Sequence, residues 1–229
     1  MAYAAINTER VSRGVCAYCG ATVSSEHCCA GCGKIQPIPA EGVDYFNFFD
    51  LPRKLRLDEA ELEKAFYALS RQFHPDYFMG AGAEEQQASV DRSSMLNDAY
   101  RTLRNPVTRA KYLLTLEGYK EAEKKAPPDL LEEVFELNMQ IEELRAAKKT
   151  GDEDEAAEAR SAIEEALTDL HKKLQGIDEQ LFSLFDDWDS ALDRGATPDR
   201  KKPLLNRVSD LLSHRSYIRN LVRDIKEEL

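Results

Sequence analysis

The sequence lacks the features that would place it in a membrane, in a secretory route or on nucleic acid. No apolar run in its 229 residues approaches the ~20 residues of a membrane-spanning helix. Residues 1–15 have no apolar signal-peptide core and too little arginine for an organelle transit peptide. We therefore expect a cytoplasmic protein, with the mitochondrial matrix as the alternative. The net charge of −11 argues against general binding to nucleic acids or anionic membranes.

Signs of enzymatic chemistry are equally sparse. The chain has 4 histidines, and it contains no G-x-S-x-G motif, no phosphate-binding P-loop and no Cys/His pair outside its cysteine cluster. An enzyme is therefore the least supported class. With 42% hydrophobic residues and many helix formers, the chain is long enough for two small helical domains and an appendage.

All 5 cysteines lie between residues 16 and 32. Two C-x-x-C-G repeats are typical of a metal site, because each presents two thiolates on one tight turn and its glycine lets the backbone bend around the ion. Four thiolates suit a structural zinc ion in tetrahedral geometry, and a disulfide pair or an iron–sulfur cluster is the alternative. The predicted ligands are Cys16, Cys19, Cys29 and Cys32.

Neighbouring residues leave some choices open around these ligands. Cys28 adjoins Cys29 and is able to exchange with it, whereas we interpret His27 as a bystander. A zinc-ribbon nucleic-acid binder would need basic residues near the knuckles, but Lys34 is the only one between residues 15 and 40. Because the segment has almost no large apolar side chains, we expect it to fold around its metal without packing against the helical domains.

A helix followed by a His-Pro-Asp tripeptide is the most informative pattern. Apolar residues at helical spacing precede the tripeptide, namely Leu62, Ala65, Phe66, Leu69 and Phe73. Pro75 has no amide proton, so the helix should end near Phe73 and leave His74 and Asp76 on an exposed loop. A second helix should follow, with an apolar face formed by Met95, Leu96, Ala99, Tyr100 and Leu103.

The predicted loop suits docking better than catalysis. Asp76 is able to accept a bidentate hydrogen bond from a partner's arginine, His74 offers a donor and an acceptor, and Pro75 lowers the entropy of the loop. A partly positive strip leads to the loop along the outer face of the first helix and consists of Lys64, Tyr67 and Arg71.

Two antiparallel helices joined by His-Pro-Asp look like a J-domain, the module that stimulates ATP hydrolysis by DnaK-type heat-shock chaperones. Residues 44–46 resemble the opening helix of that family, residues 96–103 resemble the start of its closing helix, and Asn105-Pro106 ends that helix. An ordinary Pro-Asp turn is the alternative. The chain departs from the basic second helix of typical J-domains through Asp58, Glu59, Glu61 and Glu63.

Beyond a polar linker, three apolar heptad patterns predict an antiparallel three-helix bundle of helices of similar length. They run from Leu130 to Leu144, from Ile163 to Trp188 and from Leu204 to Leu229. Breaks at residues 150–152 and 193–203 separate them, and an extended coiled coil is the alternative.

One face of the first bundle helix has more apolar and acidic residues than the packing seam needs. Leu131, Phe135 and Met139 form a stripe roughly 100–180° from the seam. An acidic stripe borders it and consists of Glu132, Glu136 and Glu143. Either the apolar stripe belongs to a wide core and the acids to a solvated face, or the two stripes together form an exposed protein-binding surface.

A cysteine segment, a J-domain and a three-helix bundle in this order resemble the HscB family, the J-proteins of iron–sulfur cluster assembly. Residues 109–119 resemble that family's connection between domains. The resemblance implies that the bundle binds an IscU-type scaffold protein through Leu131, Phe135, Glu136, Met139 and Glu143. Two positions depart from the family: His214 stands where an aromatic is expected, and Glu132 replaces an apolar residue.

The sequence therefore predicts an all-α protein with a J-domain hairpin, a three-helix bundle and a zinc-knuckle appendage. The predicted boundaries are 1–40, 41–118, 119–128 for the linker and 129–229. The leading hypothesis is a non-enzymatic co-chaperone that delivers an iron–sulfur scaffold to a DnaK/HscA-type chaperone and stimulates its ATPase. A general J-domain co-chaperone for other clients is the alternative, although it would need a Gly/Phe-rich linker or broad apolar grooves.

Overall fold

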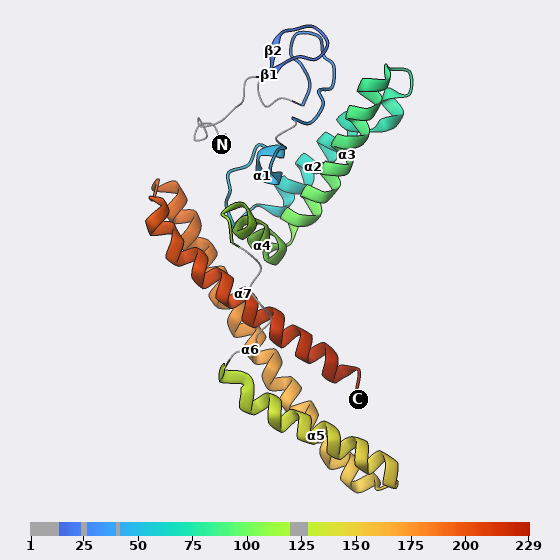
Figure 1. The fold of residues 1–229 in the computed structure, drawn as a ribbon, viewed down its shortest axis with the longest axis vertical. Coiled ribbons are helices and arrows are strands. Elements are labelled where there is room, and N and C mark those ends of the chain that lie inside the picture. Colours follow the sequence, from blue (N-terminus) through green and yellow to red (C-terminus); the bar gives the residue numbers. More distant parts are fainter. Residues whose placement is uncertain (1–13, 24–26, 40–41, 120–127) are drawn as a thin grey trace. The chain divides into compact units, whose positions relative to one another are not determined.

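The computed structural model describes residues 14–23, 27–39, 42–119 and 128–229. Helices dominate it, which confirms the predicted fold class, and the chain forms two compact units, Met1–Arg109 and Ala110–Leu229 (Figure 1). Within the described ranges, no helix is long and apolar enough to cross a membrane. The predicted linker 119–128 lies almost entirely outside the described residues.

The first unit begins with a small antiparallel hairpin of two short strands, β1 (Gly14–Val15) and β2 (Thr22–Val23). Gly14 pairs with Val23, and Val15 pairs with Thr22. The hairpin brackets the first cysteine knuckle. An isolated bridge between Cys28 and Ile35 brackets the second, so each knuckle is closed by its own short strand pairing.

Four helices follow in the order α1 (Tyr45–Phe48), α2 (Glu59–Phe73), α3 (Ala83–Arg104) and α4 (Pro106–Leu116), and the division between the two units falls within α4. Asp58 caps α2, because its carboxylate accepts hydrogen bonds from the amides of Ala60 and Glu61. Acidic residues in the first turn suit the positive end of the helix dipole. The helix ends at Phe73, as the following proline predicts.

The core of the first unit lies between α2 and α3 and is closed by α1. Its buried apolar side chains include Phe46, Phe48, Leu62, Phe73, Leu96, Ala99 and Leu103. Phe66 and Tyr100 stack at its edge with ring centroids 4.2 Å apart. The guanidinium of Arg109 is buried and donates to the carbonyls of Leu55 and Leu103, which fixes the loop before α2.

The second unit begins within α4, and its long helices are α5 (Leu131–Thr150), α6 (Glu153–Asp193) and α7 (Pro198–Lys226). The helices have 20, 41 and 29 residues, so the expectation of similar lengths is wrong. The long α6 is the common partner: α5 runs antiparallel along its first half and α7 along its second half (Figure 1). Ion pairs Glu133–Lys173 and Asp178–Arg215 join α6 to the two shorter helices.

Two positions of the predicted α7 heptad are off by one residue, whereas four positions are buried as predicted, namely Val208, Ile218, Val222 and Ile225. Leu205 and Leu212 are buried, whereas the structure leaves Leu204 and Leu211 only partly covered. Each predicted position belongs to a pair of consecutive leucines, so the pattern alone does not fix which member faces α6. A shift of one residue rotates the face by about 100°.

The contrast between seam and stripe on α5 gives a test of the fold. Replacing Leu137, which is 3% exposed, with alanine should lower the free energy of unfolding by about 2–5 kcal/mol, because a cavity is left between α5 and α6. Leu131→Ala is the matched control and should change it by less than about 0.5 kcal/mol. Denaturant unfolding followed by the fluorescence of Trp188, the only tryptophan, reports on this unit alone. Equal effects of the two variants would contradict the packing described.

Candidate functional sites

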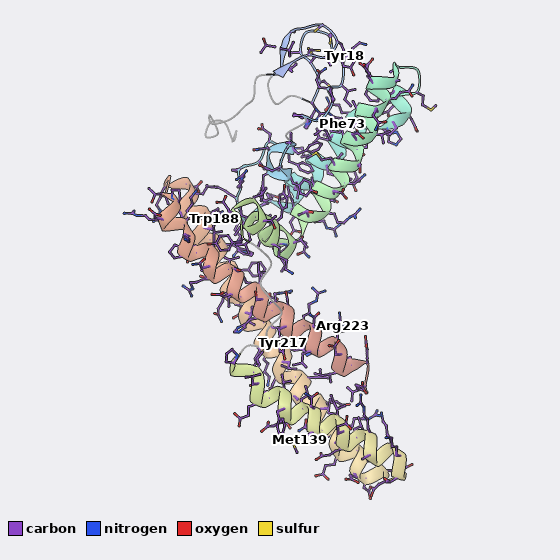
Figure 2. All side chains as sticks on the ribbon, in the orientation of Figure 1. Tyr18, Phe73, Met139, Trp188, Tyr217 and Arg223 are labelled. Atoms are coloured by element: carbon purple, nitrogen blue, oxygen red, sulfur yellow. The ribbon has the colours of Figure 1, made fainter. Side chains whose placement is uncertain are left out.

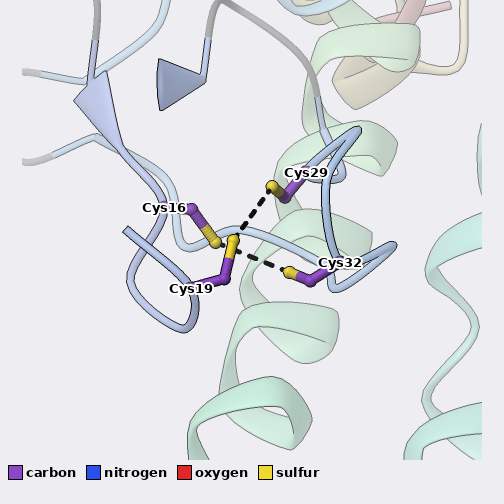
Figure 3. Close-up of side chains that lie close together, drawn as sticks. All are labelled: Cys16, Cys19, Cys29 and Cys32. Carbon is purple, nitrogen blue, oxygen red and sulfur yellow. Dashed lines mark hydrogen bonds between the residues drawn. The ribbon is translucent and has the colours of Figure 1, made fainter. Parts of the chain in front are cut away.

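Four cysteine sulfurs gather at the tip of the two knuckles (Figure 3). The sulfurs of Cys16, Cys19, Cys29 and Cys32 all lie within 4.8 Å of one another. The Cys16–Cys32 distance is 3.6 Å and the Cys19–Cys29 distance is 3.7 Å. Four sulfurs placed about 2.3 Å from one tetrahedral ion are about 3.8 Å apart, so the cluster has the size of a tetrathiolate metal site.

The two knuckles fold alike because their sequences repeat. In each, the amide of the glycine that follows the second cysteine donates to the carbonyl of the first cysteine: Gly20 to Cys16 at 3.1 Å and Gly33 to Cys29 at 2.7 Å. Both glycines have a positive φ, 73° and 72°, which a residue with a side chain rarely adopts. The glycines of the C-x-x-C-G motif therefore make the turn that brings the sulfurs together.

Backbone amides also point at the sulfurs. The amide of Tyr18 lies 3.4 Å from the Cys16 sulfur, and that of Gly31 lies 3.3 Å from the Cys29 sulfur. Burial opposes ionisation, but amide hydrogen bonds from Tyr18 and Cys19 outweigh it and lower the pKa of Cys16 to about 6. At Cys19 and Cys32 an amide hydrogen bond does not outweigh burial and the neighbouring thiols, so the pKa values of these two thiols are raised. This donor set fits a soft divalent cation held by thiolates. Cys28 lies outside the cluster, and its sulfur accepts a hydrogen bond from Gln72 at 3.2 Å.

The His-Pro-Asp tripeptide lies at the end of α2. The expected loop is a short 3₁₀ helix, Pro75–Phe78, and His74 caps it because its Nδ1 accepts the amide proton of Asp76 at 3.3 Å. The side chains of His74 and Asp76 are 51% and 76% exposed. Both polar groups of the motif are therefore presented to solvent on a short helical turn, which is the setting for a docking contact.

The predicted strip lies on the solvent-facing side of α2. Lys64, Tyr67 and Arg71 are all exposed, and they line one shallow depression together with Ala60, Glu63 and Ala68. Lys64 approaches Glu61 at 3.9 Å, a loose pair between two highly exposed side chains. The strip is therefore open to solvent and continuous with the end of α2.

The apolar stripe of α5 lies on the surface. Leu131, Phe135 and Met139 are 55%, 66% and 50% exposed, so they are not part of a wide core. Met139 projects from the outer side of α5 (Figure 2). The acidic residues Glu132, Glu136 and Glu143 are also exposed. Three large exposed apolar residues at helical spacing, edged by carboxylates, form a patch of the kind that binds another protein.

The expectation that the cysteine segment does not pack against the helical domains is wrong. His27 lies outside the sulfur cluster, as interpreted, but its ring lies 4.8 Å from the rings of Phe48 and Phe73. The segment also packs on the helices, with Ile35 completely buried and the carbonyl of Gln36 bonded to Arg92 of α3. Counting large apolar residues missed this packing because a histidine, an arginine and backbone carbonyls make most of it. A buried arginine within a helix has no distinct sequence signal.

Comparison with known proteins agrees with this architecture. A family model of the DnaJ domain matches residues 44–112. The crystal structure of the human co-chaperone protein HscB matches with a TM-score of 0.61 and 25% sequence identity, covering 94% of this chain and 98% of that one. The chaperone HscB from Vibrio cholerae matches with a TM-score of 0.50 and 25% identity over 81% of this chain and 96% of that one.

The chain therefore contains a J-domain. Its helical fold is similar to that of the HscB co-chaperones over most of the chain. Its four clustered cysteines could hold a metal.

Two neighbouring cysteines allow a matched test of the metal site. Cys29→Ser should remove the bound metal, because it deletes one corner of the sulfur cluster, whereas Cys28→Ser should retain about one ion per chain. Elemental analysis of the purified variants measures the metal. Retention of metal by Cys29→Ser together with its loss from Cys28→Ser would reverse the ligand assignment.

Proposed function

We propose that this chain is a co-chaperone that binds an iron–sulfur cluster scaffold protein and presents it to a DnaK/HscA-type chaperone, whose ATPase it stimulates. The observation that carries the proposal is one chain holding two exposed docking features in two separate units. One is the His-Pro-Asp turn of a J-domain, and the other is the apolar and acidic stripe on α5. The likeness to HscB co-chaperones over both units supports the pairing.

The chaperone side would use the end of α2. Asp76 offers a carboxylate for a partner's arginine, His74 adds a second polar contact, and Pro75 keeps the turn short. The exposed Lys64, Tyr67 and Arg71 would extend this contact along the helix as a cation and aromatic strip. No group here needs to enter the chaperone's reaction, because a J-domain acts by binding and shifting the partner's conformation.

The scaffold side would use Leu131, Phe135 and Met139 as apolar anchors, with Glu136 and Glu143 at the rim. Large side chains that are half exposed in the free chain gain most from burial against a partner. The acidic rim would favour a scaffold surface that carries basic residues and would raise the rate of encounter. His214 lies on α7, is only partly covered and already has an interaction of its own, so we leave it out of the anchor set.

The four-cysteine site would hold a structural zinc ion. Zinc favours tetrahedral thiolate ligands, and with four cysteines no position is open for a substrate. Thiolates survive in reducing compartments, which agrees with a cytoplasmic or mitochondrial-matrix protein. A general co-chaperone for other clients remains the second candidate, and the localised stripe on α5 favours a single folded partner over extended clients.

The chaperone contact predicts a loss of stimulation without loss of fold. Asp76→Asn and His74→Gln should each abolish stimulation of a DnaK-type ATPase, because both side chains are exposed and contribute to the partner contact but not to the core. Single-turnover ATP hydrolysis measures the effect, and Asp210→Asn, an exposed change on α7, is the control. Normal stimulation by Asp76→Asn would refute the assignment of this turn.

The proposed scaffold contact predicts a loss of affinity for the scaffold protein that is separate from the loss of ATPase stimulation. Leu131→Ala combined with Phe135→Ala should weaken scaffold binding at least about tenfold, since truncated interface anchors cost about 1–4 kcal/mol each. Glu136→Lys should weaken it less and in a salt-dependent way. Titration calorimetry with an IscU-type scaffold measures both, while stimulation of the ATPase by the variant alone stays unchanged. Unchanged affinity of the double variant would remove the stripe from the binding site.

A further inference from the structure

The cysteine segment, described over residues 14–23 and 27–39 and called the module below, is joined to the J-domain by one buried cation. Arg92 of α3 is 5% exposed, and its guanidinium donates three hydrogen bonds to the module. They run from Nε to the carbonyl of Gln36 at 2.5 Å, from Nη2 to the carbonyl of Pro37 at 3.2 Å, and from Nη1 to Nδ1 of His27 at 2.6 Å. A buried guanidinium needs all these acceptors, because any that is lost leaves part of its charge desolvated without compensation.

His27 connects Arg92 to α1, because its ring is hydrogen-bonded to both. Because the carbonyl of Phe48 is only able to accept, Nε2 of His27 must carry the proton of their 3.1 Å hydrogen bond, and Nδ1 then accepts from Arg92. The imidazole is therefore held in one orientation between a carbonyl on one side and a guanidinium on the other.

Phe73, the residue directly before the His-Pro-Asp turn, packs against His27 and Arg92. Its ring lies 4.8 Å from that of His27 and 5.8 Å from the guanidinium carbon of Arg92. Its carbonyl accepts hydrogen bonds from the hydroxyls of Ser89 at 2.6 Å and Ser93 at 2.9 Å. Figure 2 shows Phe73 among the side chains between the module and the helices. One residue earlier, Gln72 donates to the sulfur of Cys28.

The contacts start beside a metal ligand and end beside the docking motif. His27 and Cys28 directly precede Cys29, and Gln72 and Phe73 directly precede His74. Ile35 is the only large apolar side chain that the described part of the module buries completely, so metal ligation must supply much of its order. An ordered module is thus required to hold the acceptors of Arg92 and the ring of His27 in place.

We propose that the four-cysteine module is a brace for the His74-Pro75-Asp76 turn, with His27 and Arg92 as positioning residues, so that metal loading sets how readily the chain engages its chaperone. This inference rests on the proposed function for its effect on the chaperone, and on the first unit alone for its effect on the turn. The module acts through the population of the docking-ready turn and makes no contact with the reacting ATP.

The brace predicts a particular kinetic signature. If a variant leaves the turn in its docking-ready form only a fraction of the time, the apparent affinity falls by that fraction, while the bound state is unchanged. His27→Ala should therefore raise the concentration that gives half-maximal ATPase stimulation about tenfold and leave the maximal stimulation intact. His27→Gln should lie between this variant and the natural chain, because an amide both donates and accepts.

Amide hydrogen exchange of the full chain tests the brace without any chaperone. His27→Ala should raise exchange in residues 73–78 about tenfold, and chelation of metal from the natural chain should do the same, with reversal on adding Zn²⁺. Exchange in α5–α7 should not change. The matched control is Lys34→Ala, which removes the 2.8 Å Lys34–Glu85 pair from the same interface but does not touch Phe73.

Outcomes of these experiments separate the brace from the function. Unchanged exchange at residues 73–78 after both chelation and His27→Ala overturns the brace, even if Asp76→Asn still abolishes stimulation. Increased exchange with an unchanged half-maximal concentration overturns the link to the chaperone. Normal stimulation by Asp76→Asn refutes the proposed function and leaves the exchange result standing. If His27→Ala fails to fold, chelation of the natural chain and Gln72→Ala, an exposed position, give the same readout.

Discussion

The buried charge of Arg92 is the constraint on which the arrangement of the first unit depends. An arginine that is almost fully covered by protein is destabilising unless acceptors surround it, and here most of the identified acceptors come from the cysteine segment. The module, α1 and the end of α2 are therefore held together by one guanidinium and the imidazole beside it. The position of the docking turn relative to the core follows from that contact, because Phe73 is packed against both groups.

The second unit depends on a different kind of order. Its long helix α6 buries a continuous apolar seam, including Ile163, Leu170, Leu181 and Trp188, and the two shorter helices pack along it. Since the seam uses one face of α5, the opposite face is free to carry large apolar side chains outward. Because these side chains are at least half exposed, packing within the unit does not account for their size, which supports the proposed binding surface.

Local patterns predicted much of this structure. The four clustered cysteines are predictable because C-x-x-C-G fixes a turn and its two thiolates together, and the end of α2 is predictable because proline acts on its immediate neighbours. The sequence pattern does not decide whether Leu131 and Phe135 lie on the surface, since a period of 3.6 residues does not say how wide the core is. Consecutive leucines in α7 leave the buried member of each pair undecided, and the pattern underestimates the length of α6 because its first turns carry mostly acids.

The contact of the module with the helices is not predictable from the sequence, for a different reason. It joins His27 to Arg92, residues 65 positions apart in sequence, and it uses polar groups and carbonyls that no hydropathy pattern marks. Contacts of this kind are decided by the tertiary fold, whereas knuckles and helix ends are decided locally. The locally determined features, which the sequence predicts, are thus those that indicate the class of protein. The contacts that link its parts depend on the tertiary fold and are not predicted.

The central claim is that one chain couples a scaffold protein to a chaperone, and one kinetic measurement tests it most directly. The ATPase rate of a DnaK/HscA-type chaperone should be compared with this chain alone, with an IscU-type scaffold alone and with both together. The account predicts that the two together raise the rate well beyond the sum of their separate effects, because the chain brings the scaffold to the chaperone. A combined rate that only equals that sum would contradict it.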